Sequence, residues 1–358
     1  MTRPIDFSKF RKSITKSITG ISSGFNDPKT WISTGNYCLN YLISGDFYKG
    51  IPLSKVVCFA GESGSGKSLI VSGNIVKNAQ DQGIFIVLLD SENALDEDWL
   101  QAFGVDTSPE KLLKLGVSMI DDVAKIISEF MKNYKSEYAE AGDEAPKVLF
   151  VIDSLGMLLT PTDVAQFEKG DMKGDMGRKP KALTALVRNT VNLIAEHDIG
   201  LVATNHTYAS QDMFDPDDKI SGGQGFVYAS SIVVAMRKNK LKENDDGIKG
   251  PNVLGIKSVC KVVKSRYSKP FESVKINVPW EGGMDAYSGL FDLFLDAGIF
   301  VKQGNRYKYT SKVTGEEILE FKKHWKGDKL DVVMSEFDDT LLVCTDPADS
   351  NEEEIDGE

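Results

Sequence analysis

Short, almost wholly apolar runs alternate with amphipathic stretches through the middle of the chain. Apolar runs of about four to eight residues without polar alternation are typical of strands in a parallel sheet covered by helices on both faces. Such strands are predicted at Val56–Ala60, Ile84–Asp90, Val148–Asp153 and Leu201–Asn205, with helices at Lys67–Gln82, Ile120–Tyr138 and Lys181–His197. This alternation predicts an α/β fold with a mainly parallel, twisted central sheet flanked by helices.

Two further patterns extend this core. The runs SIVVAM, SVCKVV and SVKINV follow one another with loops between them, which predicts an added strand-rich edge. Near the amino terminus, apolar side chains recur at three- and four-residue steps, as on one stripe of a helix. They are Phe7, Phe10, Ile14, Ile18 and Ile21. This helix either packs on its own domain or forms an arm that docks on a neighbouring subunit.

The composition is that of an ordinary globular protein. The chain has 358 residues, of which 41% are hydrophobic and 27% charged, and this excludes a disordered, collagen-like or disulfide-scaffold protein. No apolar run approaches the ~20 residues of a membrane-spanning helix, and from the polar start MTRPIDFSKF we expect no signal peptide. The four cysteines stand singly and there are three histidines, so we expect free thiols in a reducing cytoplasm and no zinc or histidine-rich metal site.

The net charge of −11 comes almost entirely from one end of the chain. Residues 336–358 contain ten aspartates and glutamates and no lysine or arginine, so the other residues together carry a charge near −1. Single-sign terminal blocks are usually solvated and disordered. We therefore expect an acidic tail on a balanced body. The low overall pI does not exclude a nucleic-acid partner, because local charge decides that kind of binding.

The strongest motif is a glycine-rich loop between the first predicted strand and the first predicted helix. It fits GxxxxGK[ST] and comprises Gly61, Glu62, Ser63, Gly64, Ser65, Gly66, Lys67 and Ser68. Glycines let the backbone curl so that successive N–H groups and the helix start face a phosphate. In this context the loop predicts ATP binding, with Lys67 at the β- and γ-phosphates and Ser68 as a Mg²⁺ ligand. The alternative is a chance match on a turn.

Two carboxylates at strand ends complete the predicted nucleotide site. Asp153 ends the apolar strand VLFVID and is the natural second Mg²⁺-side group. Glu92 follows the strand after the glycine-rich loop, and the carboxyl ends of parallel strands meet at one edge of the sheet. We interpret Glu92 as the group that activates or orients an attacking water. The alternative is that this turn only caps the next helix, for which Ser91 and Asn93 would serve equally.

Several further motifs occur in the order and spacing of one protein family. The run LLDSENALDEDWLQAFGVD, following GESGSGKS, resembles the RecA family of recombinases, and ISTGNYCLNYLISG is similar to the segment that leads into that family's core. VIDSLGML, SGGQGFVYASS, KVVKSRYSKPF and EGGMDAYSGLFDL then follow in the family's order. The resemblance covers about residues 31–300, and NHTYASQDMF together with the Lys-Ser-Arg variant makes it nearest to the phage UvsX-type recombinases.

The resemblance implies a role for each matching position around the nucleotide. It implies that Glu92 activates the attacking water, that Asp96 and Trp99 contact the adenine, and that Tyr287 is a second adenine neighbour. His206 stands at the strand end where the family carries a polar γ-phosphate sensor, often glutamine. An imidazole there could donate to the γ-phosphate and transmit its presence into the loop that follows.

Lys264 and Arg266 match the family's pair of cations that reach into the ATP site of the neighbouring subunit. A positive charge supplied from outside stabilises the transition-state phosphate, as an arginine finger does. Arg266 departs from the commoner lysine, and an arginine can bind a phosphate through two N–H groups. The alternative is an ordinary basic pair on the surface of an edge strand.

Two long segments without periodicity, residues 161–180 and 207–225, follow directly on strand ends and correspond to the family's DNA-binding loops. The first is basic, and its cations continue along one face of the following helix. The DNA contacts predicted there are Lys169, Lys173, Arg178, Lys179, Lys181 and Arg188. The alternative is an ordinary solvated face.

The second segment is acidic, with four aspartates against Lys219, and this composition disfavours direct contact with phosphate. Its end could instead offer the backbone N–H groups of Gly222 and Gly223 at a helix start. Side chains that could stack on bases or wedge between them are Met176, Tyr208 and Phe214. Because such contacts tolerate any base, we expect sequence-independent DNA binding, with specificity left to base pairing between strands.

The resemblance implies a RecA-like P-loop ATPase core and an ATP- and Mg²⁺-dependent recombinase. Such a protein forms a helical homo-oligomeric filament on single-stranded DNA and pairs it with homologous duplex, in recombination, repair and recombination-dependent replication. The resemblance also implies single-strand-binding and mediator proteins as partners, and a phage protein in the bacterial cytoplasm. We divide the chain into an oligomerisation arm (1–30), an ATPase and DNA-binding core (31–299), a small carboxyl-terminal lobe (300–335) and an acidic tail (336–358).

Three other functions fit parts of the pattern. A hexameric helicase on the same core would need a large amino-terminal domain, whereas about thirty residues precede this core. A small-molecule kinase has no use for two long loops at strand ends, and a non-catalytic paralogue would not need the intact set of Lys67, Glu92 and Asp153.

The small lobe is a candidate for duplex capture. The tail either competes with phosphate for the lysines of the core or serves solubility alone.

Overall fold

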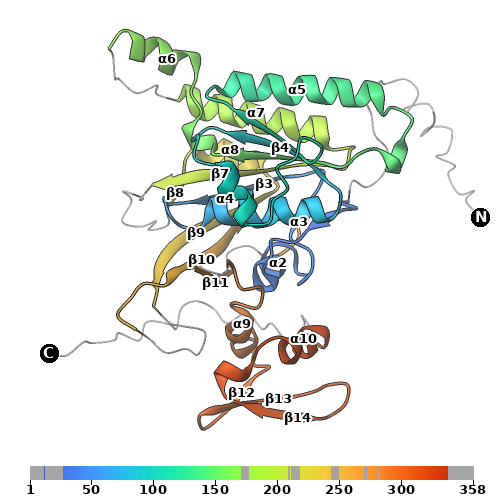
Figure 1. The fold of residues 1–358 in the computed structure, drawn as a ribbon, viewed down its shortest axis with the longest axis vertical. Coiled ribbons are helices and arrows are strands. Elements are labelled where there is room, and N and C mark those ends of the chain that lie inside the picture. The colour runs from blue at the N-terminus through green and yellow to red at the C-terminus, as the bar shows by residue number, and fades with distance from the viewer. Residues whose placement is uncertain are drawn as a thin grey trace, which may run out of the picture.

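The computed structural model describes residues 12, 27–170, 177–208, 210, 218–242, 250–269, 272–280 and 283–337. A large α/β unit and a smaller carboxyl-terminal lobe make up this part of the chain (Figure 1). The apolar stripe of the predicted arm lies outside the described residues; its members are Phe7, Phe10, Ile14, Ile18 and Ile21. The arm therefore stays a prediction.

A nine-stranded sheet forms the centre of the large unit, with the order β11-β10-β9-β3-β7-β6-β4-β5 and with β8 paired to β7. The strands are β3 (Val56–Gly61), β4 (Phe85–Asp90), β5 (Leu112–Gly116), β6 (Val148–Asp153), β7 (Ile199–Tyr208), β8 (Lys219–Ile220), β9 (Ile232–Leu241), β10 (Gly255–Lys264) and β11 (Ser273–Pro279). Neighbours from β9 to β5 are parallel, whereas β10 and β11 add an antiparallel edge. The predicted fold class is confirmed, including its strand-rich edge.

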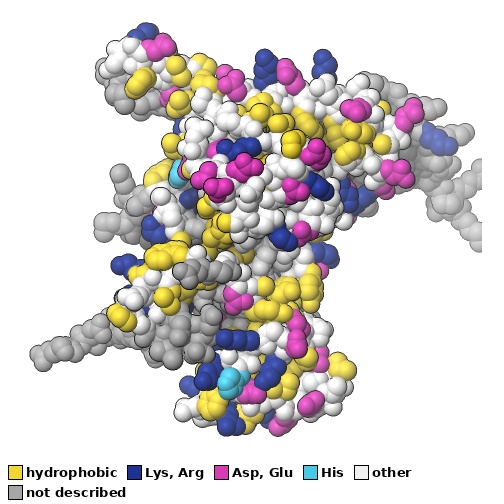
Figure 2. Space-filling model, in the orientation of Figure 1, with side chains coloured by type: hydrophobic (Ala, Val, Ile, Leu, Met, Phe, Trp, Pro, Cys, Tyr) yellow, Lys and Arg dark blue, Asp and Glu magenta, His cyan; other side chains and the backbone are white. Residues whose placement is uncertain are grey.

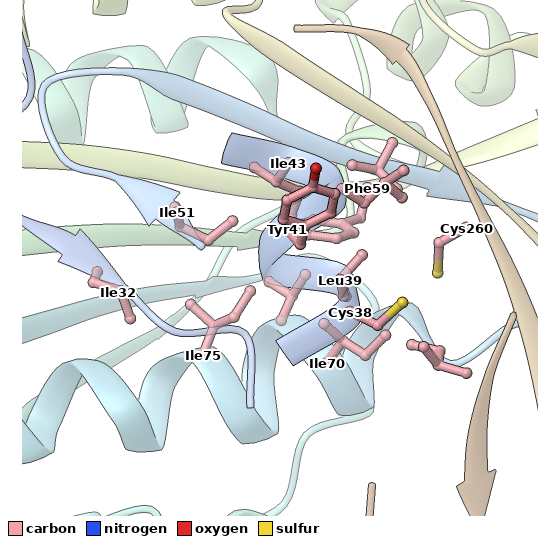
Figure 3. Close-up of a cluster of buried hydrophobic side chains, with 14 of the residues drawn as sticks. Ile32, Cys38, Leu39, Tyr41, Ile43, Ile51, Phe59, Ile70, Ile75 and Cys260 are labelled. Atoms are coloured by element: carbon pink, nitrogen blue, oxygen red, sulfur yellow. The ribbon is translucent and has the colours of Figure 1, made fainter. Parts of the chain in front are cut away.

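Helices cover both faces of the sheet, which explains why its strands are apolar at successive positions. One face carries α5 (Ile120–Glu137), α7 (Arg178–Ile194) and α8 (Gly223–Ala229), and the other carries α2 (Tyr37–Ser44), the π-helix η1 (Leu69–Ile75), α3 (Val76–Asp81) and α4 (Glu97–Ala102). In β3, Val57 and Phe59 enter one apolar cluster, and Cys58 enters the other. Figure 3 shows the first cluster, where Leu39 and Ile70 lie with Phe59.

The local structure departs from the prediction in two places. The helix expected at Lys67–Gln82 begins as the π-helix η1, and Ser72 within it donates to the Asp153 carboxylate. The first aperiodic segment contains a helix, α6 (Pro161–Glu168), which projects from the large unit (Figure 1). Its start is a capping box between Thr160 and Asp163, with a proline at the first helical position. Eight residues were too few to show an apolar period, although this start signal was present in the sequence.

The carboxyl-terminal lobe is joined to the large unit through one continuous apolar cluster. Its elements are α9 (Leu290–Asp296), β12 (Val301–Gln303), β13 (Arg306–Thr310), β14 (Glu317–Glu320), the 3₁₀ turn η4 (Lys322–His324) and α10 (Asp328–Ser335). Phe300 packs on Phe294 of α9 and on Trp325, with ring centroids 5.7 and 4.5 Å apart. Phe337 packs on Tyr41 of α2 at 5.3 Å. The lobe is therefore anchored on α2 of the large unit.

The boundary between the lobe and the acidic tail lies two residues later than the charge pattern suggested. The carboxylate of Glu336 accepts hydrogen bonds from Tyr309 Oη at 2.7 Å, Ser311 Oγ at 2.8 Å and Lys312 N at 2.7 Å. These donors lower the pKa of Glu336, the Tyr309 hydroxyl most of all. Glu336 and Phe337 thus pack with the lobe, and the acidic tail stays a prediction for residues 338–358, which lie outside the described residues.

The remaining short elements are β1 (Trp31–Ile32) paired antiparallel with β2 (Ile51–Pro52), and the 3₁₀ turns η2 (Gly142–Glu144) and η3 (Leu155–Met157).

Within the described ranges, none of the helices combines the length and apolarity needed to cross a bilayer. Cys38, Cys58 and Cys260 are buried free thiols, and burial raises the pKa of the Cys58 and Cys260 thiols to about 12. Cys344 lies outside the described residues.

Phe300→Ala is expected to lower the free energy of unfolding by about 3–5 kcal/mol, the range for truncating a buried phenylalanine. Phe300 is 3% exposed and contacts four other rings, those of Phe291, Phe294, Tyr309 and Trp325. Urea titration followed by tryptophan fluorescence measures the change, and Trp325 is a probe within the cluster. Val313→Ala is the control, because Val313 is 79% exposed. Equal midpoints for both variants would contradict the shared core.

Candidate active site

The glycine-rich loop leaves the sheet between β3 and η1, with strands on both sides of it. Gly61 pairs with His206 of β7 on one side and with Met236 of β9 on the other. A Cβ on Gly61 would lie 2.4 Å from Met236 O, so only glycine fits there. Gly64 and Gly66 have φ of +73° and +93°, in the left-handed region that favours glycine. The sequence pattern of the loop is therefore a steric requirement.

Lys67 folds back over this loop. Its Nζ donates to Gly61 O at 2.9 Å and to Glu62 O at 2.8 Å, and the residue is 6% exposed. Burial lowers the pKa of Lys67, while the negative charges of Asp153 and Glu92 act in the opposite direction. An ammonium group is thus held at the mouth of a loop whose backbone can bind phosphate.

A second cation at the loop was missed by the sequence analysis. Lys238 Nζ donates to Ser63 O at 2.6 Å and lies 3.6 Å from Glu62 Oε2, while Lys238 N donates to Glu62 Oε1 at 3.2 Å. Lys238 stands two residues beyond the partner of Gly61 in β9. The pairing of β9 with β3, which no local motif reveals, places it there.

Asp153 and Ser68 supply the oxygen groups expected at a Mg²⁺ site. Asp153 is 3% exposed, and its two oxygens accept from Ser72 Oγ at 3.0 Å and Thr204 Oγ1 at 2.5 Å. Ser68 is half-buried at the start of η1. The described residues contain no group of three or more His, Cys, Asp or Glu side chains suited to a metal. One carboxylate and one hydroxyl fit Mg²⁺, which keeps most of its waters and uses few protein ligands.

The turn that carries Glu92 is fixed by a buried carboxylate. Asp90 is fully buried, accepts from Glu92 N at 3.1 Å and from Leu95 N at 3.2 Å, and pairs with Lys114 at 3.1 Å. The helix that follows, α4, is capped by Asp96, whose side chain accepts from Trp99 N at 2.7 Å. The helix-cap alternative for Ser91 and Asn93 is therefore wrong, and the Glu92 side chain is left for another use.

Glu92, Ser154 and His206 form a compact polar cluster at the strand ends. Ser154 Oγ lies 2.8 Å from Glu92 Oε1 and 3.1 Å from His206 Nε2, and His206 Nε2 lies 3.2 Å from Glu92 Oε1. Ser154 was not singled out from the sequence. The only local signal was its place directly after Asp153, at the end of a buried strand.

The side chains expected around adenine have different surroundings. Asp96 is exposed and caps α4, and the half-buried ring of Trp99 packs on Phe103 at 4.6 Å. Tyr287 lies near α2, where its ring packs edge-on against Tyr37 at 5.1 Å. Its hydroxyl donates to Asp331 of α10 at 3.1 Å, and burial together with that carboxylate raises the pKa of Tyr287 to about 12. Tyr287 thus stands between the large unit and the lobe.

Lys264 and Arg266 lie at the end of β10, away from the glycine-rich loop of their own chain. Lys264 faces Val233, which pairs with Cys58, so it sits three residues or ~10 Å below Gly61 along the sheet. Lys264 Nζ donates to Val227 O at 3.2 Å, Tyr228 O at 2.5 Å and Ser230 O at 2.6 Å, the carbonyls at the end of α8. Burial lowers the pKa of Lys264, and Arg266 lowers it further. Arg266 is exposed.

The basic residues of the first predicted DNA loop have unlike environments. Lys169, Lys181 and Arg188 are exposed. Arg178 Nη1 donates to Thr162 Oγ1 at 3.0 Å, whereas Lys179 turns inward and donates to Gly156 O at 2.7 Å, and burial lowers its pKa. Lys173 and Met176 lie outside the described residues.

The stem of the second predicted DNA loop is an antiparallel hairpin of β7 and β8. Ser221 N donates to His206 O at 2.9 Å, and Asn205 Nδ2 donates to Ser221 O at 2.7 Å, so the hairpin stem is tied to the strand end that carries His206. Gly222 caps α8 with φ of +96°, and Gly223 has φ of +75°. Tyr208 is 59% exposed. Phe214 lies outside the described residues.

Two exposed aromatic side chains near these loops were missed. Phe167 on α6 is 74% exposed and Tyr228 on α8 is 70% exposed. Large exposed apolar side chains at the ends of the predicted DNA-loop segments suit contact with bases, whose faces stack on aromatic rings. In the sequence they could not be told apart from core residues of short helices.

A basic cleft of about 1140 Å³ separates the lobe from the β10–β11 edge of the sheet. Aspartates 285 and 292 line it together with a larger number of lysines, namely Lys257, Lys275, Lys302, Lys322, Lys323 and Lys326. Lys and Arg side chains gather on the lobe at the bottom of Figure 2. The indole Nε1 of Trp325, which also lines the cleft, is buried without a hydrogen-bond partner among the described residues.

Comparison with known proteins places these features in one family. The family described as "RecA N-terminal domain" matches residues 11–285. The chain is 28% identical over 329 residues to a recombination and repair protein of Enterobacteria phage T4, covering 89% of this chain and 78% of that protein. It is 24% identical over 318 residues to protein RecA of Cutibacterium acnes, covering 87% and 82%. For protein RecA of Clostridioides difficile (strain 630) the values are 26% over 327 residues, 90% and 85%.

The family match spans most of the chain and includes the glycine-rich loop, Glu92, Asp153, His206 and the Lys264–Arg266 pair. The ATP-binding fold and the order of its strand-end motifs agree with it. The chain therefore belongs to the RecA family of DNA-dependent ATPases, which act in recombination and repair.

Proposed function

We propose that this chain assembles on single-stranded DNA as an ATP-bound helical filament and exchanges that strand with a homologous duplex. The observation that carries the proposal is the double engagement of His206. Its side chain contacts Glu92 and Ser154 beside the glycine-rich loop, while its carbonyl accepts from Ser221 at the return of the second DNA loop. One residue thus touches both the hydrolytic group and the stem of a DNA-binding loop, as ATP-gated DNA binding requires.

In the proposed hydrolysis, the loop backbone and Lys67 bind the phosphates, and Glu92 orients the attacking water. Lys67 would exchange its present carbonyl acceptors for phosphate oxygens. Ser65 Oγ, buried without a partner among the described residues, is a further donor in the same loop. Mg²⁺ held by Ser68 and Asp153 supplies positive charge that offsets the charge of the phosphates. Trp99, Asp96 and Tyr287 remain the proposed adenine contacts.

The neighbouring subunit is proposed to complete each ATP site with Lys264 and Arg266. The support is their position, because a side chain ~10 Å below the loop along the sheet does not serve the nucleotide of its own subunit. A head-to-tail interface that repeats by rotation and rise generates a helical filament. Hydrolysis would then require assembly.

The exposed cations Lys169, Lys181 and Arg188 are proposed to follow the phosphate backbone of the bound strand, and Tyr208 and Phe167 to contact bases. The basic cleft beside the lobe is proposed to capture duplex. Single-strand-binding and mediator proteins are proposed partners on the family resemblance alone.

Electron microscopy with ATP and single-stranded DNA tests the proposed function. Extended helical filaments are expected in the presence of both ligands, and short oligomers in the absence of ATP. A strand-exchange assay on the same sample should transfer a labelled strand from homologous but not heterologous duplex. Closed rings that do not extend with DNA length would instead indicate a helicase on the same core.

Lys67→Ala is expected to abolish ATP binding, whereas Glu92→Gln should retain it and lower kcat for ATP by orders of magnitude. The first change removes the ammonium group at the loop, and the second removes only the charge that orients water. Fluorescent-nucleotide binding and phosphate release, both measured with single-stranded DNA present, separate the two effects. Parental hydrolysis by Glu92→Gln would exclude Glu92 from the chemistry.

Mixing two inactive variants tests whether the ATP site is shared between subunits. Glu92→Gln and Lys264→Ala should each hydrolyse ATP slowly, but an equal mixture should recover activity at about a quarter of its interfaces, where an intact Glu92 meets an intact Lys264. Mixing Glu92→Gln with Lys67→Ala is the negative control, because each subunit then lacks a group of its own ATP site and no interface is complete. An equal mixture of Glu92→Gln and Lys264→Ala that stays as slow as its components would place Lys264 outside the neighbour's site.

Truncation after Phe337 is expected to tighten duplex binding at low salt. It removes nine acidic residues but keeps Glu336, which is bound within the lobe. A polyanion competes with phosphate for lysines, and salt screens this competition because the Debye length is ~8 Å at physiological ionic strength. Duplex titrations of full-length and truncated protein at low and moderate salt measure it. Superimposable curves at both salts would leave solubility as the role of the tail.

A further inference from the structure

Ser154 Oγ joins two groups that the proposed function assigns to separate tasks. It is 2.8 Å from Glu92 Oε1 and 3.1 Å from His206 Nε2, and Ser154 itself is fully buried. Glu92 and His206, by contrast, have side chains that are 33% and 34% exposed. The buried hydroxyl is therefore the fixed member of the cluster, and the two exposed side chains are the members that a ligand can reach.

The number of protons in the cluster sets the direction of its hydrogen bonds. An ionised Glu92 can only accept, so the single proton of Ser154 Oγ is donated to Glu92 Oε1. Ser154 Oγ is then the acceptor for His206, whose Nε2 must carry a proton that it shares between Ser154 Oγ and Glu92 Oε1. The network thereby selects the Nε2–H tautomer, the one that can donate to a phosphate oxygen.

The backbone around Ser154 is held on both sides. Ser91 Oγ donates to Ser154 O at 2.6 Å and accepts from Ser154 N at 2.8 Å, so the strand ends of β4 and β6 are bound together at this residue. The imidazole is held in turn by Gly156, where an added Cβ would lie 2.5 Å from His206 Cδ2. Ser154 therefore has little freedom to move with either partner. A shift of His206 or Glu92 changes its hydrogen bond to Ser154 instead of moving Ser154.

We infer that Ser154 is a positioning residue that holds Glu92 and His206 as one hydrogen-bonded unit, so that ATP hydrolysis responds to the state of the second DNA loop. This inference rests on the proposed roles of those two residues. His206 O and Asn205 Nδ2 bind Ser221 at the base of that loop. A shift of the hairpin stem moves the His206 ring and changes the hydrogen bonds that Nε2 makes with Ser154 Oγ and Glu92 Oε1, so the Glu92 carboxylate gains or loses a donor while Ser154 stays in place.

Ser154→Ala removes one buried hydroxyl and is expected to lower DNA-stimulated kcat by roughly tenfold to a hundredfold, as displaced catalytic groups do. KM for ATP should stay unchanged, because Lys67 and the loop are untouched, and the ratio of DNA-stimulated to DNA-free hydrolysis should fall. Ser154→Thr restores the hydroxyl and should recover part of this ratio. Thr190→Ala is the matched control, a buried hydroxyl that donates to Leu186 O of its own helix.

A double-mutant cycle distinguishes positioning from a general structural effect. In the Glu92→Gln background, Ser154→Ala should change kcat by less than about twofold, since Ser154 acts through Glu92. An undiminished effect in that background, or an unchanged stimulation ratio in Ser154→Ala alone, would overturn the inference. Absence of DNA-stimulated hydrolysis in the parent protein would instead overturn the proposed function. A circular-dichroism melt of each variant identifies any loss of folding. Gly156→Ala displaces the His206 imidazole directly, so this variant should also lose the stimulation of ATP hydrolysis by DNA.

Discussion

The parallel register of four neighbouring strands is the constraint on which the site depends. Gly61 pairs with His206, Asp90 pairs with Asp153, and Ile152 pairs with Ala203, so the ends of β3, β6 and β4 lie within about two residues of one another along the sheet, beside His206 of β7. Backbone hydrogen bonds along the whole sheet maintain that alignment. A slip of one residue in any of these pairs would turn the strand-end side chains to the opposite face. The apolar clusters on both faces oppose such a slip, because it would expose buried side chains on one face and crowd the other.

The parts of this arrangement that are encoded locally could be predicted from the sequence. The glycine-rich loop follows a steric pattern, and the buried strands are visible as apolar runs that end in Asp90 and Asp153. The family resemblance added roles for His206 and Lys264, which no periodicity contains. Contacts between neighbouring strands could not be predicted from the sequence. Lys238, for example, contacts the glycine-rich loop because β9 pairs with β3. Ser154 is similar: its importance comes from two partners that lie 62 and 52 residues away in the chain.

Predictions from charge alone were the least complete. Lys179 was grouped with the predicted DNA contacts, and its ammonium group donates to Gly156 O and is half-buried. Glu336 was grouped with the tail, although three donors of the lobe hold its carboxylate. In both cases a long side chain reaches a specific acceptor or donor set that the linear sequence does not show. Counting charges identified a basic and an acidic segment in the sequence and left the partner of each charge undetermined.

The labelling rates of the three buried thiols would report local unfolding of this protein. Cys38 lies on α2, Cys58 in the central strand β3 and Cys260 in the antiparallel edge strand β10. Each is inaccessible to an alkylating reagent in the folded state, and burial raises the pKa of each thiol, which further slows its reaction. Labelling must therefore wait for local or global opening. Because the three positions sample the anchor of the lobe, the centre of the sheet and its edge, their separate labelling rates would map which region loosens first.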